Sequence, residues 1–276
     1  MKIQVSFHSP TDEQIYNDLK KHFRDTPFMP FGRNLSNFFR GNPALMVTDL
    51  RMLDIATFRP DLILILLSPQ YLLDNWLSAE SVALAKYGEI RGDNLVCLYL
   101  TNNLQASEIP SHLRTCPVLA PGSASTQDLI GALKSVRRLK RVFIGHGRSK
   151  DWQDLSSILS NFDLKPDHFE AASTAGMYTL ERVQHMLIAA DFAFLIMTAE
   201  DAHADGNLHA RENVTYELGM FHGYLGFRRA IILREHPCHE FTNIKGLQHI
   251  EFHTGNMSDV SDAIREVLQR EGVLNR

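Results

Sequence analysis

The sequence predicts an α/β fold in two domains, each built on a mainly parallel central sheet. Short apolar segments alternate with amphipathic helical segments along the whole chain, which is the pattern of layered α/β proteins. Residues 62–67 form an uninterrupted apolar run, typical of a strand that is buried on both faces of a parallel sheet. The length of 276 residues corresponds to about two domains of ordinary size.

Composition narrows the class of protein. A hydrophobic content of 44% and a charged content of 22% are ordinary for a globular protein in water. The net charge of -4 argues against a nucleic-acid partner held by phosphate attraction. The cysteines Cys97, Cys116 and Cys238 lack CxxC spacing and are typical of reduced thiols. The chain begins with a strand pattern instead of a secretory signal, and no apolar run is long enough for a bilayer, so we expect a cytoplasmic protein with no membrane partner.

The first half of the chain supplies one α/β unit. Its expected strands lie at residues 2–7, 61–67 and 94–100, and its expected helices at residues 11–24, 49–58, 76–88 and 127–139. Residues 28–48 are either a strand with a long functional loop or an irregular packing segment. Residues 117–126 are rich in turn formers and precede a helix with a basic end. We place a boundary near residues 138–141, which divides the chain into domains 1–138 and 139–276.

The second half starts a new α/β unit. Its expected strands lie at residues 141–145, 168–170, 192–197, 229–234 and 248–252, separated by helices and by a polar, mobile-looking loop at residues 202–209. Five strands in this alternation fit a three-layer, flavodoxin-like sheet. Ligands of such sheets bind beyond the carboxyl ends of the strands, so the segments that follow the strands carry the candidate site residues.

A glycine-containing turn follows the first strand of this second unit. Gly145, His146, Gly147 and Arg148 lie between the strand and the next helix. Such a turn lets backbone N–H groups and a helix N-terminus approach a phosphate, and an arginine adds a bidentate contact. The turn is therefore either a site for a dinucleotide pyrophosphate or ribose, or an ordinary strand-to-helix connection.

The stretch at residues 210–221 holds the candidate catalytic acid. Asn213 suits the N-cap of a helix, and Val214 and Leu218 mark the core-facing stripe of that helix. Glu217 lies four residues after Asn213, in the first turns of the helix. Arg211 lies just before the N-cap candidate Asn213. Glu217 is therefore either a functional carboxylate or a solvated glutamate that the helix dipole favours.

Residues 141–252 resemble the bacterial TIR-like domains found as effectors of anti-phage signalling systems, including the cyclic-nucleotide-activated Pycsar and STING-linked kinds. The matching pieces are Val142 to Arg148, Glu181, Thr198-Ala199-Glu200-Asp201, Arg211 to Gly219, and Ile244-Lys245-Gly246-Leu247. The resemblance implies that Glu217 is the catalytic residue of an NAD glycohydrolase, with NAD+ as substrate and no separate cofactor. It also implies that Glu181 is a pocket residue.

The run from Leu67 to Glu80 resembles the signature of TIR domains of a different subfamily. A turn made by Ser68, Pro69 and Tyr71 leads to Trp76, and Glu80 follows four residues later on the same helix face. The resemblance implies a second TIR-like domain, which serves assembly or sensing or has a second site at Trp76 and Glu80. Residues 28–48 depart from the usual loop, so Glu80 is either a working or a structural carboxylate.

Cleavage of the nicotinamide–ribose bond assigns a role to each candidate. Glu217 stabilises the oxocarbenium-like ribose, Asn213 and Arg211 orient it, and the turn at 145–148 holds phosphate. Thr198 and Asp201 line the mouth of the site. The resemblance further implies self-association and a trigger, either a nucleotide second messenger or a phage-derived signal. The product is ADP-ribose or a cyclised form.

Other classes of function stay open on the sequence. One alternative is a non-catalytic TIR scaffold or nucleotide sensor, and another is a nucleoside deoxyribosyltransferase-like enzyme. Two groups of residues contain several candidate metal ligands, namely His236, Cys238 and His239, and the trio His203, His209 and His222. Neither has a second ligand pair at zinc spacing, so no metal site is expected.

Overall fold

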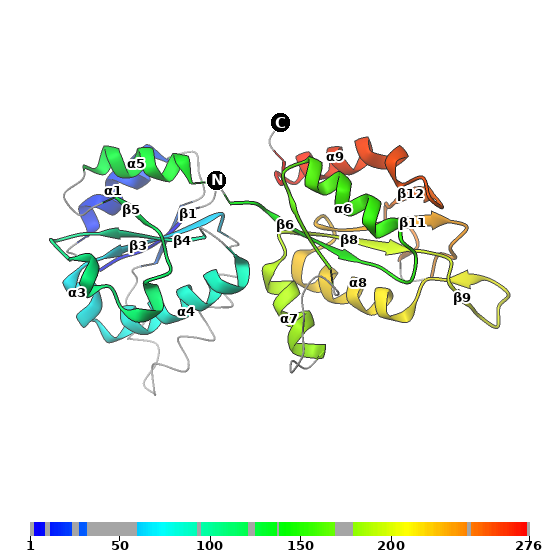
Figure 1. Cartoon of the computed structure of the whole chain (residues 1–276), viewed down its shortest axis with the longest axis horizontal. Coiled ribbons are helices and arrows are strands. Elements are labelled where there is room, and N and C mark those ends of the chain that lie inside the picture. Colours follow the sequence, from blue (N-terminus) through cyan, green and yellow to red (C-terminus); the bar gives the residue numbers. More distant parts are fainter. Residues whose placement is uncertain are drawn as a thin grey trace. The chain divides into compact units, whose positions relative to one another are not determined.

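The computed structural model describes residues 3–8, 12–23, 28–31, 60–92, 95–120, 125–136, 138–168, 179–241 and 244–274. Within these ranges the side chains of residues 28–31, 76, 120 and 179–181 are not described. The chain forms two compact units, Met1–Arg138 and Leu139–Arg276 (Figure 1). Each unit has helices on both faces of a parallel sheet, which confirms the predicted α/β fold class.

Unit 1 contains a sheet of strand order β2-β1-β3-β4-β5, and every pairing in it is parallel. Its strands are β1 (Ile3–Ser6), β2 (Phe28–Phe31), β3 (Leu62–Leu67), β4 (Val96–Leu100) and β5 (Val118–Ala120). Its helices are α1 (Glu13–His22), α3 (Pro69–Leu73), α4 (Asn75–Arg91) and α5 (Thr126–Ser135). Helices α1 and α5 cover one face of the sheet, and α3 and α4 lie on the other (Figure 1).

Unit 2 repeats this topology. Its sheet order is β12-β11-β8-β6-β7, again all parallel, so both units have the flavodoxin-like order 2-1-3-4-5. The strands are β6 (Arg141–Gly145), β7 (Lys165–Asp167), β8 (Phe192–Met197), β11 (Ala230–His236) and β12 (Ile250–His253). The helices are α6 (Asp151–Asn161), α7 (Thr179–Ala189), α8 (Glu212–Leu225) and α9 (Ser261–Arg270). Helices α6 and α9 cover one face, and α7 and α8 cover the other (Figure 1).

The central strand β8 shows why this sheet is rigid. All six of its side chains are buried, and alternate residues point to opposite faces. Phe192, Phe194 and Ile196 pack with α6 and α9, whereas Ala193, Leu195 and Met197 pack with α7 and α8. Each large apolar side chain buried in this way contributes roughly 1.5–3 kcal/mol. The carboxyl ends of β6 and β8 are therefore firmly placed.

Three segments of the chain differ from the sequence-based expectation. The second strand of unit 2 is β7 at Lys165–Asp167, earlier than residues 168–170, because Asp163 adopts a positive φ of 55° and turns the chain directly after α6. The turn-rich stretch at 117–126 contains the short edge strand β5. The polar loop at 202–209 includes an antiparallel hairpin of β9 (Asp201–Ala202) and β10 (Leu208–His209). Among the described residues, no helix has the length and apolar character of a bilayer span.

Candidate functional site

The carboxyl ends of the parallel strands in unit 2 meet at one edge of the sheet, and acidic side chains gather there. Strand order reverses between β6 and β8, which is the place where ligands bind in open α/β sheets. The acids of the segments at this edge include Asp151, Glu200, Glu217 and Glu235. Their hydrogen-bond partners separate one of them from the other three.

Helix α8 positions Glu217 over the end of β6. Its stripe of Val214, Leu218 and Phe221 is buried, and the Phe221 ring stacks on Phe143 of β6 at a centroid distance of 4.3 Å. Glu217 precedes Leu218 and is partly buried. A Cβ at Gly145 would lie 2.8 Å from the Glu217 Oε2 atom and 2.3 Å from Leu195 Cδ1. The missing side chain at Gly145 therefore leaves the space that the carboxylate occupies.

The carboxyl group of Glu217 lies in an environment that disfavours its ionised form. Burial raises the pKa of Glu217 from its ordinary value of 4.5 to about 7. In the part of the chain that the structure describes, no group donates a hydrogen bond to this carboxylate. A partly buried acid without donors, at the ligand-binding edge of a sheet, has the character of a functional group.

Glu200 is held in the opposite way. Its carboxylate accepts hydrogen bonds from the backbone N–H groups of Arg148, at 2.7 and 2.9 Å, and of Ser149, at 3.1 Å. The Thr198 hydroxyl donates a further bond of 2.6 Å. Burial raises the pKa of Glu200, but these bonds and the nearby charge of Arg211 lower it further, so the pKa falls below its ordinary value.

This network changes the picture of the glycine turn. One of the two interpretations of the sequence is that the backbone N–H groups there meet a phosphate. The structure shows that the N–H groups of Arg148 and of the next residue, Ser149, bind the carboxylate of Glu200. A Cβ at Gly147 would lie 2.3 Å from Glu200 Oε1, so this glycine makes room for the carboxylate. The Arg148 side chain is exposed and pairs with Asp201 at 3.2 Å. The turn is an anion site whose occupant is a side chain of the protein itself.

The two remaining acids are structural. Glu235, at the end of β11, accepts a 2.8 Å bond from the Ala199 backbone N–H and another from the Thr254 hydroxyl. Asp151, at the start of α6, accepts bonds from the Ser149 hydroxyl and from the Gly255 backbone N–H. These bonds tie together the loops that follow β6, β8, β11 and β12.

The other predicted site residues of α8 need a correction. The helix begins at Glu212 with Arg211 as N-cap, because the Arg211 carbonyl already accepts bonds from the N–H groups of Val214 and Thr215. Asn213 is therefore inside the first turn and does not cap the helix. Its side chain is exposed and makes no hydrogen bond to Glu217. Arg211 lies close enough to Glu200 for its charge to act on that carboxylate.

An aromatic group lies beside the glycine turn. The His146 ring stacks on Trp152 at 5.0 Å, and His168 lies 4.3 Å from Trp152 and 5.9 Å from His146. His146 Nδ1 contacts the Gly147 carbonyl at 2.9 Å, whereas its Nε2 atom has no partner among the described residues. The three rings pack on one another, and the unpartnered Nε2 atom of His146 is buried. The side chain of Glu181, on α7, lies outside the described residues.

The predicted second site in unit 1 lies partly outside the described residues. Glu80, on α4, is 2% exposed, and the side chain of Trp76 lies outside the described part of the chain. At the carboxyl edge of this sheet Asp12 is fully buried. It accepts hydrogen bonds from the hydroxyl groups of Ser68 at 3.1 Å and Thr101 at 2.8 Å. A role for Glu80 in catalysis stays a prediction.

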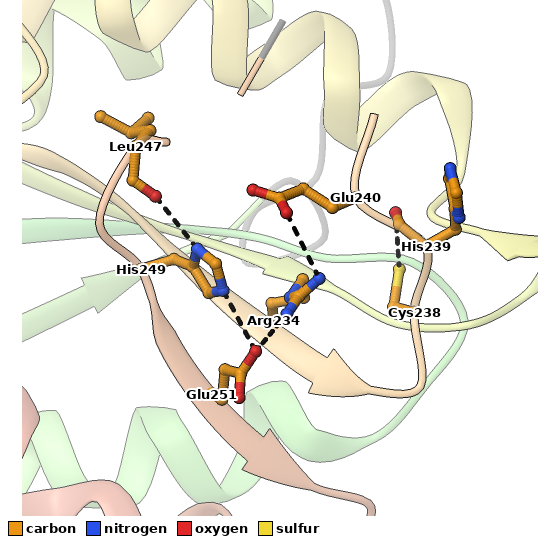
Figure 2. Close-up of polar contacts among 7 residues, drawn as sticks. All are labelled: Arg234, Cys238, His239, Glu240, Leu247, His249 and Glu251. Carbon is orange, nitrogen blue, oxygen red and sulfur yellow. Dashed lines mark hydrogen bonds and ion pairs between the residues drawn. The ribbon is translucent and has the colours of Figure 1, made fainter. Parts of the chain in front are cut away.

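A cavity of about 540 Å³ lies beyond the end of β11 in unit 2. Its lining comprises Arg234, His236, Pro237, Cys238, His239, Glu240 and Lys245. Figure 2 shows Arg234 between Glu240, at 4.0 Å, and Glu251, which His249 also contacts at 3.3 Å. Glu217 does not line this cavity, so the two features are separate parts of the molecule.

Comparison with known proteins agrees with the resemblance in the sequence. Residues 141–254 match the family model described as "CAP12/Pycsar effector protein, TIR domain". The chain is also 27% identical over 118 residues to a protein of Escherichia coli (strain K12) that carries the name "Uncharacterized protein YuaY". That alignment covers 41% of this chain and 40% of YuaY.

Proposed function

Because the second unit is a TIR domain of the CAP12/Pycsar effector type, we propose that it is an NAD+ glycohydrolase. Glu217 is the proposed catalytic carboxylate. The observation that carries the proposal is its environment: three acids at the sheet edge accept hydrogen bonds, whereas Glu217 has no donor among the residues that the structure describes. Unsatisfied acids of raised pKa are typical of catalytic sites.

Cleavage of the nicotinamide–ribose bond requires chiefly a carboxylate that is held close to the ribose. The bond between the ribose C1′ and the nicotinamide nitrogen breaks, and its electron pair leaves with nicotinamide, which departs neutral and needs no general acid. A water oxygen then bonds to C1′ and loses a proton, which gives ADP-ribose. The transition state resembles an oxocarbenium ion, and an ionised Glu217 in a site of low polarity stabilises that positive charge.

The glycine turn supplies the second contact. We infer that the pyrophosphate of NAD+ competes with Glu200 for the N–H groups of Arg148 and Ser149. The Arg148 side chain, exposed and paired only with Asp201 among the described residues, is free to turn toward the phosphate. Binding therefore opens a site that is closed by an internal anion.

The effector context follows from the family description, and we propose that the chain acts in anti-phage defence after a trigger. Unit 1 then serves as an assembly or sensing surface. Two units joined in one chain have a high effective concentration for each other, and the contacts between separate copies complete the proposed assembly. On this proposal NAD+ consumption depends on protein concentration.

The test follows nicotinamide release from NAD+ by purified full-length protein, at dilute and at crowded concentrations. Glu217→Gln removes the charge and keeps the shape, and we expect turnover to fall roughly 100-fold to 1,000-fold. Glu212→Gln is the matched control, since Glu212 is exposed on the same helix. Wild-type turnover in Glu217→Gln would falsify the assignment.

A nucleotide-sensing module without catalysis is the second candidate. The Glu200 network favours it, because backbone N–H groups that converge on an anion in the turn before a helix bind phosphates whether or not a reaction follows. This candidate predicts binding of NAD+ or another nucleotide, measured by calorimetry, with no nicotinamide released. A deoxyribosyltransferase-like enzyme would instead transfer the base of a nucleoside and leave NAD+ intact.

A further inference from the structure

A group of histidines lies apart from the Glu217 site, where the β9–β10 hairpin meets the segment after β11. Asp205 and His209 come from the hairpin, and His239 comes from the other segment. One nitrogen or oxygen atom of each side chain lies within 4.8 Å of the other two. The His209 Nε2 and Asp205 Oδ2 atoms are 2.9 Å apart. The sequence separates these ligands by up to 34 residues, and the fold brings them together.

The separations fit a transition-metal ion. Ligand atoms bound at about 2.0–2.1 Å to a tetrahedral Zn²⁺ lie roughly 3.3 Å from one another. The distance between His209 and Asp205 is already close to that value. Because all three ligand atoms lie within 4.8 Å of one another, a small rotation of the His239 side chain brings its nitrogen to the same spacing. Two imidazoles and one carboxylate are a ligand set that zinc accepts, with a water in the fourth position.

The surrounding bonds already hold these side chains in place. Asp205 Oδ1 accepts a 2.9 Å bond from the Asn207 backbone N–H, which leaves Oδ2 directed at His209. The His239 backbone N–H donates a 2.8 Å bond to the Leu208 carbonyl and ties the two segments together. Backbone bonds of this kind orient ligands in metal sites.

Charge and access also favour a cation. The side chain of Asp205 supplies a carboxylate to the group. Figure 2 shows the His239 ring directed away from Arg234 and Glu251. Asp205 and His239 are exposed and His239 lines the cavity beyond β11, so an ion reaches the group from solvent.

We propose that Asp205, His209 and His239 bind one divalent transition-metal ion of the zinc class. The ion fastens the hairpin to the segment after β11. The Glu200 backbone N–H donates a 3.0 Å bond to the His209 carbonyl, so the ligand His209 and the anion in the glycine turn belong to one bonded unit. The metal therefore steadies the strand ends from which Glu200 enters the candidate site. The proposal does not depend on NAD+ cleavage.

The experiment uses untagged full-length protein, stripped with EDTA, desalted and titrated with Zn²⁺. Bound metal is measured by equilibrium dialysis and elemental analysis, and we expect one Zn²⁺ per chain. Co²⁺ in place of Zn²⁺ is expected to give the visible absorption of a tetrahedral site with nitrogen and oxygen ligands. Hydrogen exchange of the amides at residues 199–210 is expected to slow when Zn²⁺ is added.

Variants decide whether these side chains are the ligands. His209→Ala and His239→Ala are each expected to weaken Zn²⁺ binding roughly 100-fold or more, and Asp205→Asn is expected to weaken it about tenfold. Mutation of a residue that only hydrogen-bonds to a metal ligand already lowers metal affinity by about 10–100-fold. His185→Ala, exposed on α7, is the matched control and keeps wild-type affinity.

His203→Ala tests the boundary of the site, because this ring stacks on His209 at 4.0 Å but is not one of the three ligands. It is expected to keep the stoichiometry of one. Absence of stoichiometric Zn²⁺ binding by the wild type, or wild-type affinity in both His209→Ala and His239→Ala, would overturn the proposal. Circular dichroism of each variant confirms that the fold is retained.

Discussion

The two units of this chain share a strand order and differ at the edge where function is expected. In unit 1 the acid at the carboxyl edge is Asp12, which is fully buried and bound by the hydroxyl groups of Ser68 and Thr101. In unit 2 the comparable edge carries Glu217, which is partly buried and has no donor among the described residues. Other acids at the edge of unit 2 are hydrogen-bonded as Asp12 is, so among the described residues Glu217 is what sets this edge apart, and the site, not the fold, decides the function.

Substitution of one glutamate in each unit tests most directly which unit carries the active site. Glu217→Gln is expected to lower nicotinamide release roughly 100-fold to 1,000-fold. Glu80→Gln, in the buried part of α4, is expected to leave turnover within about twofold, because no substrate reaches a side chain that is 2% exposed. Equal losses in both variants would mean that the active site has been assigned to the wrong unit.

Stability as a function of pH sharpens the same contrast. The pKa of Glu217 rises from 4.5 to about 7 on folding, so the folded state holds its proton more tightly than the unfolded state. The stability this provides is complete below pH 4.5 and is lost as the pH rises through 7. Relative to Glu217→Gln, the wild type is expected to lose about 3 kcal/mol of unfolding free energy across that window. Hydrogen exchange of the β8 amides measures this in unit 2, and a constant difference would contradict it.

Gly145 tests the space that the carboxylate needs. In Gly145→Ala the new methyl group meets Leu195 and Glu217, so we expect about 1–3 kcal/mol of destabilisation and roughly 100-fold slower turnover from a misplaced carboxylate. Gly219→Ala is the matched control on α8, where no atom lies within 4 Å of the added Cβ. It is expected to keep activity and to gain about 0.5–1 kcal/mol of stability. Wild-type kinetics in Gly145→Ala would remove the steric basis of the site.

Glu200 gives the smallest expected effect. In Glu200→Gln the bonds to Arg148 and Ser149 lose their ionic character, which weakens the internal competitor by about 1 kcal/mol. The KM for NAD+ is therefore expected to fall roughly fivefold, with little change in kcat. Asp154→Asn, which alters an exposed carboxylate in the first turn of α6, is the control and should change KM less than twofold. A higher KM in Glu200→Gln would show that Glu200 supports the turn and does not compete with substrate.

Much of the fold followed from local patterns in the sequence. The apolar runs of β3 and β8 predicted buried parallel strands, and the stripe of Val214, Leu218 and Phe221 predicted the packing of α8. The edge strands β5 and β7 were missed or displaced, because strands of three residues carry too little periodicity to read. The start of α8 was placed two residues late, since the Arg211 carbonyl opens the helix without a side-chain cap.

The sequence indicated single residues of the candidate site but not the hydrogen bonds that connect them. Glu217 and the glycine turn were identified, whereas the occupation of that turn by Glu200 depends on a contact across 52 residues. The proposed metal group has no signal in the sequence for the same reason. His209 and His239 belonged to two separate histidine groups in the sequence, and Asp205 belonged to neither. Non-local pairing of this kind has no signal in spacing.

The measurement that most directly tests the central claim is the pH dependence of kcat/KM for nicotinamide release between pH 5 and pH 9. An ionised Glu217 is required on this account, and its pKa is about 7. The rate is expected to rise about tenfold per pH unit below 7 and to level off above it. A profile that is flat from pH 5 upward would mean that the reaction does not use this carboxylate.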